Sequence, residues 1–134
     1  TIEQNGLKET AVRLNKGIIA FSPLAQGLLT NRYLNGIPED SRVRTDGRFL
    51  KESAITEEKL AQIRALNEIA SSRGQTLAEM ALAWILKDGK VTSVLIGASR
   101  PEQILDNIKA LENTAFTEDE LKAIDKASGF GGKA

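Results

Sequence analysis

Two short segments hold the side chains best suited to bind an anionic ligand. The first is SVLIGASRPEQILDN, residues 93–107, in which an apolar run ends in Gly97, Ser99 and Arg100 and a helix-like pattern starts at Pro101. Glycine lets a ligand approach the backbone closely, and a guanidinium matches phosphate oxygens. The free N–H groups at the start of a helix also favour an anion. The chemistry predicted here is the binding of a phosphate group.

The same residues also suit a purely structural role. Ser99 and Glu102 have the spacing of a capping box, and Pro101 suits the first turn of a helix. Arg100 would then be a solvated side chain. Residue chemistry alone therefore leaves anion binding and helix capping both open.

The second segment is AFSPLAQGLLT, residues 20–30. Ser22 and Pro23 follow a short apolar run, and Gln26 and Gly27 add a polar group and a flexible backbone. A turn fixed by its proline and glycine is the alternative. Two successive strand ends of this kind nevertheless favour a binding site, because the loops after the last two strands of βα barrels often bind phosphate.

The elements that must position these segments alternate between helices and strands. A short apolar run predicts a strand buried on both faces at Ile18–Phe21, and Val91–Ile96 is predicted to be the second strand. Apolar periodicity and capping residues predict helices over 4–15, from Thr56 to Gly74, from Thr76 onwards, over 101–111, and from Thr117 to Gly129. This order is typical of an α/β protein with a parallel sheet.

Two strands make a poor independent sheet, and their unpaired edges are open to association. The chain is therefore expected to be part of something larger. One edge should be covered either by strands outside this chain or by another copy of it.

Composition restricts the classes of function. The 134 residues are 41% hydrophobic and 27% charged, with no net charge, which gives no support to a nucleic-acid or anionic-membrane partner. The sequence has no cysteine and no histidine, so thiolate and imidazole metal ligands are excluded. It has no apolar run long enough for a membrane span and no signal-peptide pattern at its start, so a cytoplasmic location is expected.

The two segments GIIAFSPLAQGLLTNRYLNGIPEDSR and TSVLIGASRPEQILDN, in this order and spacing, closely resemble the C-terminal part of the aldo-keto reductases. The branch resembled includes bacterial glyceraldehyde-phosphate reductases and potassium-channel β subunits. The resemblance covers nearly the whole chain. It implies that residues 1–134 are the C-terminal portion of a TIM (β/α)8 barrel, with strands seven and eight and the C-terminal helices. It also implies NADPH as the cofactor and a small carbonyl compound as the substrate.

The resemblance implies which residues contact the cofactor. The turn after strand seven would line the pyrophosphate, and the long segment that follows would give basic contacts. The segment after strand eight would hold the adenosine end with its 2′-phosphate. In this order the implied residues are Ser22, Pro23, Leu24, Gln26, Arg32, Arg42, Gly97, Ser99, Arg100, Gln103, Asp106 and Asn107. Without the resemblance, Gln103 and Asn107 would be interpreted as an exposed polar helix face.

The family's acid–base residues do not carry over to this chain. The family uses a tyrosine as general acid, assisted by an aspartate, a lysine and a histidine. This chain has no histidine, and its one tyrosine, Tyr33, lacks the family's Asp-x-x-x-x-Tyr context because position 28 is leucine. No catalytic residue is therefore predicted. The chain is expected to belong to an NADPH-dependent oxidoreductase or, alternatively, to a non-catalytic NADPH-binding regulatory subunit on the same scaffold.

Overall fold

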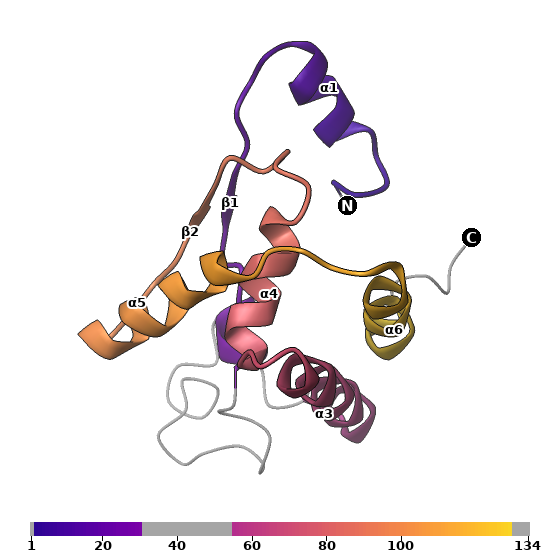
Figure 1. Cartoon of the computed structure of the whole chain (residues 1–134), viewed down its shortest axis with the longest axis vertical. Coiled ribbons are helices and arrows are strands. Elements are labelled where there is room, and N and C mark those ends of the chain that lie inside the picture. The colour runs from indigo at the N-terminus through magenta and orange to yellow at the C-terminus, as the bar shows by residue number, and fades with distance from the viewer. Residues whose placement is uncertain (1, 31–54, 130–134) are drawn as a thin grey trace.

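The structure is a computed structural model that describes residues 2–30 and 55–129. Figure 1 shows two short strands with a helix crossing one side of them and further helices around them. The elements in chain order are α1 (Leu7–Arg13), β1 (Ile19–Phe21), the 3-10 helix η1 (Ala25–Gly27), α3 (Glu57–Ser72), α4 (Leu77–Leu86), β2 (Ser93–Leu95), α5 (Pro101–Ile108), the 3-10 helix η4 (Lys109–Glu112) and α6 (Glu118–Ser128). None of the helices in these ranges is long and apolar enough to cross a bilayer.

The two predicted strands pair with each other in parallel, as expected from the helix–strand alternation. Ile19 lies opposite Ser93, and Phe21 lies opposite Leu95. Both strands are shorter than predicted, with three residues each. An α/β chain with two parallel strands and flanking helices is thus confirmed.

The prediction that the Ile18–Phe21 strand is buried on both faces is wrong for the chain as the structure describes it, and the second strand is exposed in the same way. Only the middle residue of each strand, Ala20 or Val94, is half-buried, while Ile19, Phe21 and Leu95 are 70%, 78% and 65% exposed. Contacts from α4 reach β2, and among the described residues no second layer covers the strand residues that point the other way. The apolar runs were correctly found, but residues 2–30 and 55–129 do not supply their second layer.

Three helices begin at threonines that the sequence identified. The hydroxyls of Thr56, Thr76 and Thr117 accept hydrogen bonds from the backbone N–H groups of the residues three positions later. In the last two cases a glutamate side chain returns the bond, which completes a capping box. These caps satisfy N–H groups that a helix start would otherwise leave unpaired.

The apolar core lies between α3, α4 and α6 and not on the sheet. Its buried members are Ile63, Leu66, Ala70, Leu77, Met80 and Ile124, with Leu28, Leu29, Trp84 and Phe116 among the half-buried side chains around them. In the part of the chain that the structure describes, the helices therefore carry most of the packing and support the sheet from one side.

The side chain of Arg73 links the end of α3 to the segment before α6. Its side chain is 2% exposed and pairs with Glu120 at 2.6 Å. The guanidinium also donates to the backbone oxygen of Ala115 at 2.9 Å and lies 3.8 Å from the centre of the Phe116 ring. A buried guanidinium needs several partners to offset its desolvation, and this arrangement supplies them.

Charge pairs hold α1 to the turn before β2. Nζ of Lys8, whose side chain is 2% exposed, donates to Glu3 at 2.8 Å and also to Asp88. Burial disfavours the charged amine, but these bonds outweigh it and raise the pKa of Lys8. Lys90 pairs with Glu9 at 3.1 Å beside them. This network sets the position of the turn that leads into β2.

Candidate functional site

The two candidate segments begin at the same edge of the sheet. Phe21 and Leu95 are register partners and are the last residues of their strands. The chain therefore leaves both parallel strands at one level, with Ser22 following β1 and Gly97 two residues beyond β2. In α/β proteins, ligands bind at the carboxyl ends of parallel strands. We call the exposed or half-exposed residues after these ends the strand-end surface: Ser22, Pro23, Leu24, Gly97, Ser99 and Arg100.

The backbone after β1 is strained. Ser22 has φ +51° and Ala25 has φ +46°, although neither is a glycine. A non-glycine residue in the left-handed region costs free energy, and such residues cluster at functional sites. The chain turns sharply at Ser22 into η1, so its exposed hydroxyl lies where β1 ends. The strain motivates a functional interpretation of this turn.

The chain's own packing does not explain the glycine after β2. Gly97 is exposed, and a β-carbon built on it would meet no heavy atom within 4 Å. Its φ lies outside the left-handed region that favours glycine. A group that approaches the backbone at this point from outside the described chain would explain why a side chain is absent.

Gln103, not Glu102, caps the start of α5, so the predicted pairing of Ser99 with Glu102 is wrong. Pro101 occupies the first position of α5, which places Arg100 at the cap and Gln103 at the third position. The Gln103 Oε1 atom accepts from Ser99 N at 2.8 Å, from Ser99 Oγ at 3.2 Å and from Arg100 N at 3.3 Å. The Arg100 side chain cannot accept a hydrogen bond from the helix start, because a guanidinium has no acceptor atom.

This cap gathers three of the residues that the sequence proposed for the adenosine end of a cofactor. It holds Ser99 and Gln103 together, and the Arg100 side chain is exposed at the cap of the helix. Pro101 was the signal in the sequence that could have identified Gln103 as the capping side chain, because proline favours the first position of a helix. Capping and anion binding are compatible here, since the cap uses only the amide oxygen of Gln103 and leaves the guanidinium of Arg100 outside it.

The remaining two residues of α5 differ in their surroundings. Asp106 is exposed and pairs with Lys109 at 2.9 Å, and this hydrogen bond raises the pKa of Lys109. Asn107 is only 9% exposed, so the interpretation of Gln103 and Asn107 as one exposed polar face is wrong. Because α5 packs against α4, Asn107 is enclosed while Gln103 stays at the surface.

Three of the proposed cofactor contacts cannot be located by their side chains. Gln26 lies in η1, but its side chain is outside the described part of the chain. Arg32 and Arg42 fall in residues 31–54, which the structure does not describe. Tyr33 falls there too.

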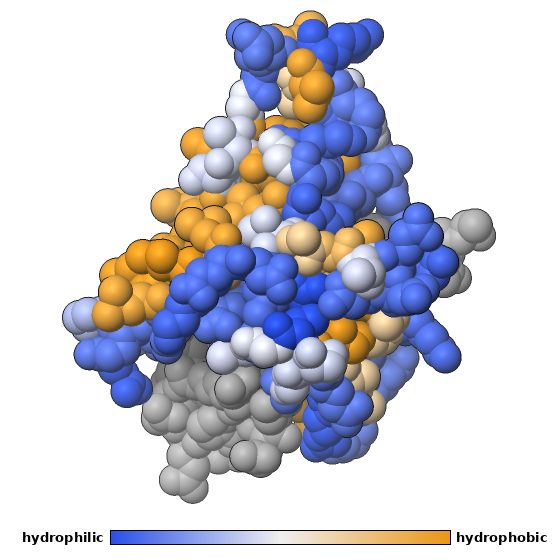
Figure 2. Space-filling model, in the orientation of Figure 1, coloured by the Kyte–Doolittle hydropathy of each residue, from blue (hydrophilic) through white to orange (hydrophobic). Residues whose placement is uncertain are grey.

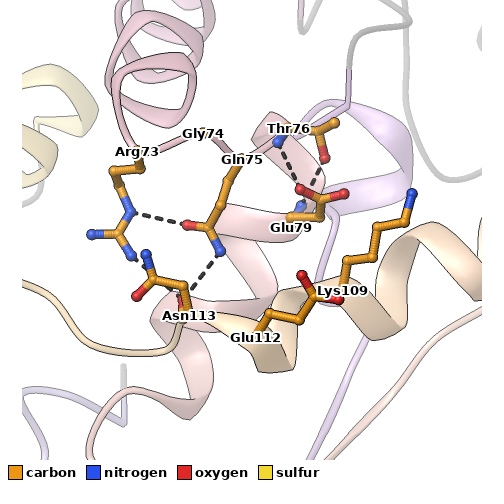
Figure 3. A pocket seen from close by; sticks show the side chains of 8 residues that line it. All are labelled: Arg73, Gly74, Gln75, Thr76, Glu79, Lys109, Glu112 and Asn113. Carbon is orange, nitrogen blue, oxygen red and sulfur yellow. Dashed lines mark hydrogen bonds between the residues drawn. The ribbon is translucent and has the colours of Figure 1, made fainter.

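The hollow of about 680 Å³ shown in Figure 3 is a different feature. It lies between the α3–α4 turn and η4 and contains none of the proposed cofactor contacts. Several of its polar groups are already paired: Gln75 accepts from Arg73 and donates to the backbone oxygen of Asn113, and Glu79 completes the cap at Thr76. This hydrogen-bonding pattern is that of a structural network, so we do not assign a site there.

The strand-end surface can bind but offers no acid–base chemistry of its own. It presents hydroxyls, a guanidinium and open backbone. Within residues 2–30 and 55–129, no group of three or more carboxylates could hold a metal ion. The arrangement suits recognition of phosphate oxygens.

Comparisons with known proteins agree with the resemblance. The model of the aldo/keto reductase family matches residues 1–128. An L-glyceraldehyde 3-phosphate reductase of Escherichia coli K12 is 52% identical over 128 residues, which cover 93% of this chain and 37% of that protein. A protein of Schizosaccharomyces pombe named as a putative voltage-gated potassium channel subunit beta is 42% identical over 118 residues, which cover 85% of this chain and 34% of that protein.

A solved structure is similar as well. The glycerol dehydrogenase of Gluconobacter oxydans superimposes with a TM-score of 0.72 at 27% identity, covering 96% of this chain and 38% of that one. The chain thus spans little more than a third of the length of the proteins that it matches.

Proposed function

Because this chain belongs to the aldo/keto reductase family, we propose that it is the cofactor-binding part of a longer NADPH-dependent reductase, called the parent protein below. In this proposal residues 1–134 are the C-terminal part of one (β/α)8 barrel. The parent protein reduces a small aldehyde or ketone, and its setting is cytoplasmic. When bound, NADPH supplies the hydride. This chain binds and orients the cofactor but contributes no acid–base residue.

The observation that carries the proposal is the strand-end surface. Two parallel strands end at one level, and each is followed by a segment that carries a serine: the backbone is strained after β1, and a glycine with open space around it follows β2. Ser22 and its strained turn would hold the pyrophosphate. Ser99 and Arg100, at the start of α5, would hold the 2′-phosphate. The open space at Gly97 suits the close approach of a dinucleotide.

The other proposed contacts complete this set. Pro23 and Leu24 would shape the turn against the pyrophosphate, and Gln26, Arg32 and Arg42 would add polar and basic contacts. Gln103 would hold Ser99 and Arg100 in place through its cap, and Asp106 would lie at the edge of the adenosine contacts. Asn107 contributes least in this proposal, because it is enclosed against α4 and not at the surface.

We expect the 134-residue chain by itself not to reduce carbonyl compounds, while the parent protein does. The physical reason is that the chain has no histidine and only one tyrosine, which lacks the family context. The measurement is oxidation of NADPH, followed by absorbance, with glyceraldehyde as the substrate. Turnover by the pure chain above the buffer rate would contradict the expectation.

A regulatory subunit that binds NADPH without catalysis is the second candidate, favoured by the identity with the channel subunit beta. The two candidates differ in the rest of the parent protein. A tyrosine, aspartate, lysine and histidine set there, together with turnover of glyceraldehyde, supports the enzyme. NADPH binding without turnover supports the regulatory subunit.

A further inference from the structure

The turn before α1 contains an asparagine that is followed directly by a glycine. Asn5 and Gly6 are both exposed, and Figure 2 shows mostly hydrophilic residues around α1, at the top of the view. None of the other asparagines in residues 2–30 and 55–129 is followed by glycine. The Asn5–Gly6 pair therefore differs from them in the one neighbour whose backbone nitrogen can attack the asparagine side chain.

The side chain of Asn5 is held against its own backbone. Its Oδ1 atom accepts a hydrogen bond from the Leu7 N–H at 3.1 Å, which is a local turn that asparagine favours. The Gly6 nitrogen lies in the chain between the two residues that this bond joins. Among the described residues the Gly6 N–H has no hydrogen-bond acceptor, and glycine has no β-carbon to hinder an attack.

The same hydrogen bond favours a reaction at the Asn5 amide. When the Gly6 nitrogen attacks Cγ of Asn5, negative charge develops on Oδ1. The Leu7 N–H already donates to that atom, and a preorganised donor at a developing oxyanion lowers the barrier. Because nucleophile and carbonyl lie in one turn, the reaction also has the advantage of an intramolecular process.

We propose that Asn5 is a site of spontaneous deamidation in the folded protein, and that the isoaspartyl product releases Lys8 from Glu3. In the first step, hydroxide removes the Gly6 N–H proton, the bond from N to Cγ forms, and the side-chain nitrogen of Asn5 leaves as ammonia after taking a proton from water. In the second step, water opens the resulting cyclic imide. Opening at one carbonyl gives aspartate at position 5, and opening at the other gives isoaspartate, whose main chain runs through the former side chain.

The isoaspartyl product adds a methylene to the main chain between Glu3 and Lys8. Glu3 Oε1 accepts from Lys8 Nζ at 2.8 Å and pairs with Lys87 at 3.4 Å. The Lys8 side chain is 2% exposed, and a buried ammonium depends on such partners. Aspartate at position 5 keeps the length of the chain and an oxygen that accepts from the Leu7 N–H, so only isoaspartate should disturb the network.

The test is peptide mapping by mass spectrometry after incubation of the folded parent protein in a mildly alkaline buffer, with electron-transfer fragmentation to distinguish isoaspartate from aspartate. We expect both products at Asn5, at a rate within about tenfold of that in a free peptide of residues 2–8. Asn15 and Asn113 are exposed but precede bulkier residues, so they are internal controls and should stay unchanged. The pair Asn35–Gly36 falls on another peptide and does not interfere.

The consequence for Lys8 is measured by brief treatment with an amine-acylating reagent. Acylation of Lys8 should rise several-fold in the isoaspartyl molecules. Asn5→Asp carries the new charge on an ordinary main chain and should be acylated at Lys8 as slowly as the unchanged protein. Asn5→Gln should leave position 5 unmodified, because its side chain would have to close a larger ring.

Three results would overturn the proposal. They are a rate at Asn5 more than about tenfold below that of the free peptide, equal modification of Asn15 or Asn113, and unchanged acylation of Lys8 in the isoaspartyl molecules. None of these measurements involves NADPH, so this proposal and the proposed cofactor site can fail separately.

Discussion

Replacing Arg100 with alanine in the parent protein should weaken NADPH binding about 10- to 100-fold and leave NADH binding nearly unchanged. Arg100 is exposed at the cap of α5, and its guanidinium takes no part in the hydrogen bonds of that cap. The 2′-phosphate of NADPH is a dianion that NADH lacks, and a charge-assisted hydrogen bond contributes roughly 1.5–3 kcal/mol. A difference of about 1.4 kcal/mol is a factor of ten in the dissociation constant.

The measurement is the dissociation constant of each cofactor by fluorescence titration. Arg64→Ala, at an exposed arginine of α3, is the matched control and should change neither constant. Equal weakening of NADPH and NADH would mean that Arg100 supports the loop in general and does not recognise the phosphate. If neither constant changes, Arg100 is only a solvated side chain at a helix start.

The largest effect on stability is expected for Arg73→Met, which should lower the free energy of unfolding of the parent protein by about 1–3 kcal/mol. The substitution keeps much of the volume but removes the ion pair with Glu120 and the bond to Ala115. It also removes the charge above Phe116. The cost stays below that of breaking a fully buried pair, because the Glu120 side chain is 29% exposed and keeps its bond from the Thr117 N–H.

Urea unfolding measures this difference, with Arg64→Met on the same helix as the control.

Hydrogen bonding from the Thr117 N–H and, less strongly, pairing with Arg73 lower the pKa of Glu120. A lowered carboxyl pKa contributes stability that is present above the unfolded value of about 4.3 and is lost as the pH falls through the folded value. The difference in stability between the unchanged protein and the Arg73→Met variant should therefore shrink below about pH 4. A penalty within about 0.5 kcal/mol, as for a surface substitution, would contradict the role of Arg73.

Local signals in the sequence were enough to find the elements. Thr76 with Glu79 and Thr117 with Glu120 satisfy each other within one turn, so the sequence alone locates these helix starts. The apolar run around Ala20 likewise predicts a strand, and the helix–strand order predicts its parallel pairing. These features depend on neighbours within a few residues or on chain order.

Features that depend on distant partners could not be predicted in this way. The enclosure of Asn107 depends on where α5 crosses α4, and the burial of Lys8 depends on Asp88 in a turn far along the chain. The exposure of Phe21 depends on a layer that this chain lacks among its described residues. For the candidate site, the residue types at both strand ends were evident from the sequence. The capping role of Gln103 was not evident, because it depends on Pro101 taking the first helical position.

The central claim is that the strand-end surface binds the phosphates of NADPH, and a crystal structure of the parent protein with the oxidised cofactor tests it most directly. We expect the 2′-phosphate within hydrogen-bonding distance of Ser99 and Arg100 and the pyrophosphate beside Ser22. A cofactor bound elsewhere, with these three residues contacting only protein or solvent, would contradict the claim.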